Sequence, residues 1–135
     1  MQPDKKKLKQ SYQQERRPMG VFQIRNLKNE RIFVGAGIDI NGIINRNRFQ
    51  LEHGNHMNER LQSEWKELGA ESFAFEILDQ MLPANDVRQD PRKELASLKD
   101  LWLEKLQPYG DRGYNERELT REEKLRQISA RRSSS

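Results

Sequence analysis

Two short apolar runs on either side of a polar turn constrain the fold of this chain more than any other feature of its sequence. Residues 20–26 read Gly-Val-Phe-Gln-Ile-Arg-Asn, and residues 31–34 read Arg-Ile-Phe-Val. Short strands that mix apolar and polar side chains across a polar turn pair as an antiparallel hairpin. The second run continues into Gly35-Ala36-Gly37, where the glycines favour a turn. This segment lacks the Lys-Ser/Thr of a P-loop, so we do not expect it to bind a nucleotide.

Two helices are predicted after this hairpin. Asn41-Gly42 is a turn signal, and a short, weakly patterned helix over 43–52 follows it. Asn58 can cap a clearer helix that ends at Gly69. The apolar side chains on one side of that helix are Leu61, Trp65 and Leu68.

A third strand and the longest helix supply most of the remaining apolar side chains. Phe73, Phe75 and Ile77 alternate with other residues and predict a strand over 72–79. The helix over 92–106 has the strongest amphipathic pattern, with Leu95, Leu98, Leu101, Trp102 and Leu106. We therefore expect an α/β (α+β) fold, with a small three-stranded antiparallel sheet flanked by helices. Its expected core is Val21, Ile24, Ile32, Val34, Leu61, Trp65, Phe73, Phe75, Ile77, Leu95, Leu98 and Trp102.

The two ends of the chain differ from its middle in charge. The formal charge is +4 over 1–20, +2 over 116–135 and −2 between them. We divide the chain into a basic N-terminal segment (1–18), a domain (19–115) and a charged C-terminal helix with a disordered tail (116–135). The N-terminal segment is helical or flexible, with a possible polar helix over 4–15. Thr120 and Glu123 form a capping-box pattern at the start of the last helix, and the disordered tail is 131–135.

Composition excludes several classes of protein. Cysteine is absent, which excludes disulfide frameworks, thiol nucleophiles and cysteine-ligated zinc. The N-terminus has no apolar stretch after its lysines, so it does not resemble a signal peptide. No apolar run approaches the roughly 20 residues that span a bilayer. We therefore expect an intracellular, cytoplasmic protein without a membrane partner.

These pieces, in this order and spacing, resemble the GIY-YIG nuclease superfamily. Gly20-Val21-Phe22 stands at the first motif of that family, and Phe33-Val34-Gly35 stands at the second. Segments 53–78 and 98–115 resemble the helix and strand that follow and the closing helix with its Gly-Tyr-Asn. The resemblance covers about residues 19–115. It implies a small antiparallel sheet flanked by helices, in a domain whose typical member cuts a DNA phosphodiester with one divalent metal ion.

The resemblance also implies which positions would carry that chemistry. The two motif tyrosines fall on Phe22 and Phe33, which have no hydroxyl to hold a water or accept a proton. The family arginine and histidine fall on Ile43 and Asn47, and the metal-binding glutamate falls on Lys99, whose ammonium group repels a cation. His56 alone matches, at a second histidine position that some members use. A small shift of the weak helix would place Arg46 or Arg48 at the arginine position.

Three hypotheses follow. The first is a domain without catalytic activity that binds DNA or RNA weakly through a basic face and needs no cofactor. Its candidate contacts are Arg25, Lys28, Arg46, Arg48 and His56 in the domain, with Lys5, Lys6, Lys7 and Arg16 before it. The second is an active endonuclease whose Mg²⁺ or Mn²⁺ site has moved to Asp39, Asp100 or Glu104.

The third hypothesis is an adaptor that binds a protein partner through the long helix and the charged ends. Residues 21–51 carry a net charge of +3, whereas residues 52–115 carry −5, and the second value favours an adaptor. The sequence does not indicate an oligomeric state. His53 and His56 have the spacing of a metal-binding pair, but we expect no metal there because no third ligand is evident.

Overall fold

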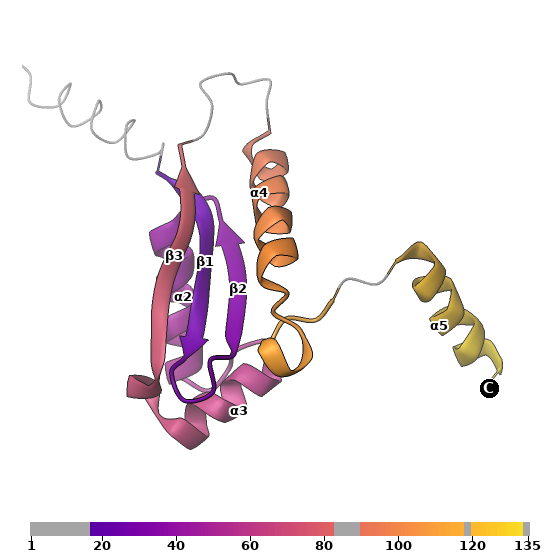
Figure 1. Ribbon diagram of the computed structural model, residues 1–135, viewed down its shortest axis with the longest axis horizontal. Coiled ribbons are helices and arrows are strands. Elements are labelled where there is room, and N and C mark those ends of the chain that lie inside the picture. The colour runs from indigo at the N-terminus through magenta and orange to yellow at the C-terminus, as the bar shows by residue number, and fades with distance from the viewer. Residues whose placement is uncertain (1–16, 83–89, 118–119, 134–135) are drawn as a thin grey trace, which may run out of the picture.

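The computed structural model describes residues 17–82, 90–117 and 120–133. The predicted helix over 4–15 and the candidate contacts Lys5, Lys6, Lys7 and Arg16 lie outside the described residues. Three antiparallel strands form one sheet in the order β2-β1-β3 (Figure 1). They are β1 (Met19–Asn26), β2 (Ile32–Gly37) and β3 (Phe73–Met81). The predicted α+β fold with a three-stranded antiparallel sheet is therefore confirmed.

The Gly-Ala-Gly segment is part of β2, so the prediction of a turn there was wrong. Phe22 pairs with Gly35 and Gly20 pairs with Gly37 across the hairpin. A Cβ on Gly35 would lie 2.6 Å from Cζ of Phe22, and a Cβ on Gly37 would lie 2.7 Å from Cγ2 of Ile43. Both distances are shorter than van der Waals contact. The glycines are therefore needed because a ring and a branched side chain cover the strand, and not because the chain turns.

The first described helix, α2 (Ile40–Glu52), begins earlier than predicted. Asp39 is its N-cap residue, and the Asp39 carboxylate accepts a hydrogen bond from the Gly42 backbone N–H at 3.2 Å. Asn41-Gly42 therefore lies in the first helical turn and not in a loop. A side-chain cap at Asp39 satisfies an N–H group that would otherwise have no partner, and this outweighs the local turn preference of the pair.

The other helices start close to the predicted positions. Helix α3 (Glu59–Leu68) is capped by Asn58, which accepts a hydrogen bond from the Leu61 N–H, and it ends at Gly69 with φ of 88°. Helix α4 (Pro91–Leu106) is capped by Asp90. Two short 3₁₀ turns, η1 (Ala70–Ser72) and η2 (Gly110–Arg112), complete the domain.

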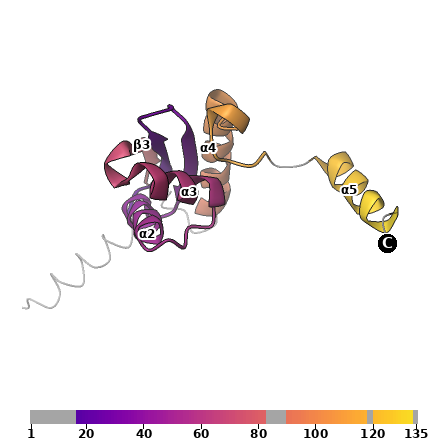
Figure 2. The same ribbon diagram turned by 90° about the horizontal axis from the view of Figure 1, so that it is seen from below.

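Helix α5 (Arg121–Ser133) stands away from the sheet and its covering helices (Figures 1 and 2). The capping box at its start is confirmed. The Glu123 N–H donates to Thr120 Oγ1 at 3.1 Å, and the Thr120 N–H donates to Glu123 Oε1 at 3.4 Å. The helix continues to Ser133, so the prediction of disorder from residue 131 onward was wrong for 131–133.

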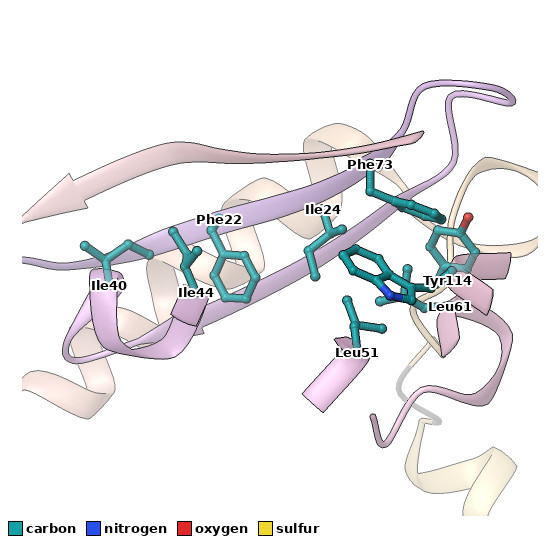
Figure 3. Packing of buried hydrophobic residues seen from close by; sticks show 9 residues of the cluster. Phe22, Ile24, Ile40, Ile44, Leu51, Leu61, Phe73 and Tyr114 are labelled. Carbon is teal, nitrogen blue, oxygen red and sulfur yellow. The ribbon is translucent and has the colours of Figure 1, made fainter. Parts of the chain in front are cut away.

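Helices cover both faces of the sheet. On one face, β1 and β3 pack against α2 and α3, and Figure 3 shows this cluster between the strands and the helices. Its buried members are Phe22, Ile24, Ile40, Ile44, Leu51, Leu61, Trp65, Phe73 and Tyr114. On the other face, Val21, Ile32 and Val34 pack against α4. The α4 side chains there are Leu98, Trp102, Leu103 and Leu106.

Two predicted apolar positions are exposed. Ile77 is 44% exposed and Leu101 is 63% exposed, so including Ile77 in the core and Leu101 on the packed side of its helix was wrong. The strand pairing shifts between Val21 and Phe22, and the residue opposite Val21 is Asp79. The shift directs Leu78 to the α4 side of the sheet, where it packs against the second cluster.

The segment after α4 closes the free edge of β2. The Tyr114 N–H donates to the Ile32 carbonyl at 2.9 Å. The Asn115 side chain then makes the two hydrogen bonds that a neighbouring strand would make. Its Oδ1 accepts from the Val34 N–H at 2.8 Å, and its Nδ2 donates to the Val34 carbonyl at 2.9 Å. The buried Tyr114 hydroxyl accepts from Asn26 Nδ2 at 3.0 Å. The Gly-Tyr-Asn segment therefore completes the sheet.

Candidate functional site

Several of the positions that the resemblance assigns to catalytic side chains lie together on the α2–α3 side of the sheet. Phe22 in β1 is buried, with 1% of its surface exposed, and lies across Gly35. Phe33 in β2 is half-buried, and its ring meets His56 edge to face with a centroid distance of 5.4 Å. Ile43 on α2 packs against the same cluster. The shared environment of these side chains is apolar.

His56 is the residue that the sequence resemblance matches to a family histidine, and it is buried, with 8% of its surface exposed. The Asn58 backbone N–H donates to Nδ1 at 3.0 Å, so Nδ1 carries no proton. Asn47 Nδ2 donates to the Ile43 carbonyl at 2.8 Å, which directs the Asn47 Oδ1 acceptor toward His56. The His56 Nε2–H therefore donates to that oxygen at 2.6 Å. Both ring nitrogens are occupied inside the domain, and neither is available for a metal ion or a phosphate.

The electrostatic environment agrees with a neutral His56. Burial lowers the pKa of His56 below its ordinary value, because the imidazolium form would lose its solvation. The adjoining loop is held as well, since the His56 backbone N–H donates to Gln62 Oε1 at 2.9 Å. His56 thus supports the start of α3 as an uncharged hydrogen-bonding group.

Lys99 lies on α4, whose apolar side chains pack against the opposite face of the sheet, and Lys99 is half-buried. Within the described residues it makes no ion pair. A positively charged ammonium group stands where the resemblance requires a carboxylate.

The described residues do not fit a divalent metal ion. In the described part of the chain, no three His, Asp or Glu side chains come together in a way that could hold a metal. Asp39 caps α2 and forms an ion pair with Arg17 at 2.9 Å, so its carboxylate already has partners. Asp100 and Glu104 are exposed on α4. His53 and His56 lie in different environments, the first exposed and the second buried.

The predicted phosphate contacts do not form one continuous surface. Arg25 is paired with Glu76 at 2.8 Å and with Glu30 at 3.2 Å. The hydrogen bonds that Arg25 donates to these carboxylates, the bond to Glu76 above all, hold the pKa of Arg25 above its usual range. Lys28 is exposed in the hairpin turn, next to residues that contact α3. Arg25 is therefore neutralised by its neighbours, and Lys28 lies away from α2.

Arg46 and Arg48 remain as exposed cations on α2. Neither forms an ion pair with a described acidic residue. The Arg48 guanidinium lies over the Phe75 ring, 4.5 Å from its centroid, so this side chain leans toward β3. The two arginines are thus the predicted contacts that are both exposed and unneutralised on the α2 side of the domain.

Sequence reasoning missed an aromatic pair at the C-terminal end of α2. The Phe49 ring stacks on the His53 ring with a centroid distance of 4.0 Å and an interplanar angle of 28°. Phe49 is 58% exposed, and His53 is exposed. The i, i+4 spacing of an aromatic residue and a histidine could have indicated the pair. Beside it lies a shallow depression lined by Leu51, Glu52, His53, Gly54, Trp65, Lys66, Gly69 and Ala70.

Comparison with known proteins identifies solved structures that share the fold. No family model matches the sequence, and no curated protein matches it. The solved structure of the catalytic domain of the homing endonuclease I-TevI matches with a TM-score of 0.60 and 24% identity, over 74% of this chain and 99% of that domain. A mutant of the catalytic domain of intron endonuclease I-TevI matches with a TM-score of 0.61 and 24% identity, over 76% of this chain and 97% of that chain.

The chain therefore has the GIY-YIG nuclease-like fold, as its motifs predicted. At this identity the likeness concerns the fold, whereas the function depends on the residues of the site. No helix in the described part of the chain is both long and apolar enough to cross a membrane.

Proposed function

We propose that this domain binds nucleic acid through the exposed side of α2 and does not cut it. The observation that carries the proposal is the position of Arg46 and Arg48, two exposed cations without an acidic partner among the described residues. They lie on a scaffold whose structural neighbours are catalytic domains of an endonuclease. Cationic side chains attract the phosphates of any sequence, so the binding is weak, tolerant of sequence and sensitive to salt.

Loss of cutting follows from the chemistry of the substituted positions. Hydrolysis of a phosphodiester needs a base for the attacking water and a positive group to stabilise charge on the phosphoryl oxygens. Phe22 and Phe33 have no hydroxyl, and His56 has both nitrogens engaged. Lys99 cannot hold a metal ion. The domain keeps a scaffold that can approach a phosphate backbone, but these positions supply no group that activates water.

A plasmid assay tests the absence of cutting. Supercoiled plasmid incubated with the full chain and Mg²⁺ or Mn²⁺ should stay intact. Nicking that disappears in Asp100→Ala would instead support the relocated metal site. Nicking that survives this change but disappears in His56→Gln would show that the matching histidine is catalytic.

Fluorescence anisotropy with a labelled duplex at low salt tests binding. The double variant Arg46→Ala with Arg48→Ala should weaken binding, and the slope of log K against log salt should become shallower by about 0.9 for each lost phosphate contact. The matched control is Arg92→Ala with Lys93→Ala, which removes two exposed cations from α4. Equal effects of the two double variants would show that only net charge matters. If the wild type binds no DNA or RNA at low salt, the adaptor becomes the better hypothesis.

A further inference from the structure

The outward side of α2 carries an exposed aromatic ring near the C-terminal end of the helix. Ile40, Ile44, Asn47 and Leu51 are the buried residues of this helix. Phe49 lies on the opposite side of the helix, because it is two residues away from both Asn47 and Leu51. Residues two positions apart do not share a side of a helix with 3.6 residues per turn. With 58% of its surface exposed, Phe49 contributes little to the core. The large apolar ring is therefore presented to solvent by the geometry of the helix.

The ring is held in a fixed orientation. His53 stacks against it at 4.0 Å, and His53 Nδ1–H donates to the Phe49 carbonyl at 2.8 Å. The hydrogen bond links the imidazole to the last turn of the helix and keeps it next to the Phe49 ring. An ordered flat surface loses less conformational freedom when another ring stacks on it than a freely rotating side chain would.

Cationic groups lie at both ends of this pair. Arg46 precedes Phe49 by three residues and shares its side of the helix. Beyond His53, the depression includes Lys66, whose Nζ lies 3.5 Å from the place where a Cβ of Gly54 would stand. Neither cation has an ion-pair partner among the described residues, although the acidic Glu52 also lines the depression. The distance along the helix axis from Arg46 to His53 is roughly 10 Å, at 1.5 Å for each residue, which corresponds to a segment of two or three nucleotides.

We propose that Phe49 and His53 form a base-stacking platform for single-stranded DNA or RNA, with Arg46 and Lys66 contacting the flanking phosphates. The inference deepens the proposed function and rests on it. Single-stranded nucleic acid is bound where exposed aromatic rings alternate with cationic groups, because unpaired bases can leave their own stack and lie on a ring. A duplex presents phosphates, but its bases stay stacked inside and cannot reach Phe49.

The test compares single-stranded and duplex oligonucleotides by fluorescence anisotropy with the full chain. Labelled oligothymidylate, oligouridylate and a DNA duplex of the same length are titrated at low salt. Phe49→Leu should weaken single-strand binding by about 5- to 150-fold, because a stacked base contributes roughly 1–3 kcal/mol, and should leave duplex binding unchanged. Phe49→Tyr keeps the aromatic face and should bind like the wild type. Met57→Ala removes another exposed apolar side chain (90% exposed) and should change nothing.

The outcomes separate the two proposals. If Phe49→Leu leaves single-strand binding unchanged while Arg46→Ala weakens it, the platform is wrong and the proposed function stands. Equal losses of single-strand and duplex affinity in Phe49→Leu would also overturn the platform. If no oligonucleotide binds the wild type at low salt, the proposed function itself fails, and the platform fails with it. Thermal unfolding of each variant confirms that it is folded, which is expected because the Phe49 side chain is mostly exposed.

Discussion

The Nε2 atom of His56 lies 2.6 Å from Oδ1 of Asn47, and this contact defines the His56 imidazole as a neutral hydrogen-bond donor. The other ring nitrogen accepts from the Asn58 N–H, next to the start of α3. Protonation of Nδ1 would remove that acceptor and place a charge in a buried position. The histidine that matches the family is thus part of the structural support of α3.

This arrangement predicts how stability changes with pH. Because the pKa of His56 is lowered in the folded state, the unfolded chain binds more protons than the folded chain at pH values below the ordinary pKa of histidine. The free energy of unfolding therefore falls as the pH drops below about 6.5. His56→Gln should remove this part of the dependence, whereas a change at the exposed His53 should keep it. Asp39, Glu76 and Glu123, whose pKa values are lowered, lose their stabilising effect only at more acidic pH. Urea unfolding at several pH values measures this, and an equal slope in wild type and His56→Gln would contradict it.

Gly35 is expected to tolerate no side chain while Phe22 is present. A Cβ at residue 35 would lie 2.6 Å from the Phe22 ring, so Gly35→Ala should destabilise the domain by about 1–3 kcal/mol through overpacking. Phe22→Leu shortens the opposing side chain. A double-mutant cycle should therefore show a combined loss smaller than the sum of the two single losses. Additive losses in urea unfolding would mean that Gly35 is needed for another reason.

Asn115 is expected to hold the edge of β2. Asn115→Ala removes both side-chain bonds to the Val34 backbone and should cost about 1–3 kcal/mol, with faster hydrogen exchange at the Val34 amide. Asn115→Asp keeps an acceptor for the Val34 N–H but places a carboxylate oxygen against the Val34 carbonyl. In Asn115→Asp, the Val34 amide hydrogen should therefore exchange more slowly than in Asn115→Ala. Unchanged exchange in both variants would show that the edge does not depend on this side chain.

Trp102 joins α4 to the sheet by packing and by one polar contact. Its ring packs on the cluster of Val21, Ile32 and Val34, and its Nε1–H donates to Asp79 Oδ2 at 3.2 Å. Trp102 is only half-buried, so Trp102→Ala should cost about 3 kcal/mol, at the low end for a large aromatic residue. Trp102→Phe keeps most of the packing and should cost about 1 kcal/mol.

The control for Trp102 is its neighbour on the solvent side of α4. Leu101→Ala removes an exposed side chain and should stay within about 0.5 kcal/mol of the wild type in urea unfolding. A loss in Leu101→Ala as large as that in Trp102→Ala would contradict the packing of α4 described here.

Local sequence determined the features that depend on interactions between residues close together in the chain. The hairpin, the cap at Asn58 and the capping box of Thr120 and Glu123 each depend on residues within a few positions of one another, and each was predicted. The motif spacing also identified the fold, because it reflects the lengths of strands and turns. The nucleic-acid-binding role stays a prediction, since it depends on a ligand and not on the order of the chain.

Tertiary contacts decided the rest, because their partners lie far away in the sequence. Gly35 pairs with Phe22 in the sheet and lies under its ring, and the local turn preference of glycine does not reflect either contact. Arg25 is neutralised by Glu76, which only strand pairing brings to its side. His56 is buried next to Asn47 of α2, and this contact makes the candidate catalytic group an uncharged side chain that supports the start of α3. Sequence supplied the residue types, and the fold determined which charges and rings remained exposed.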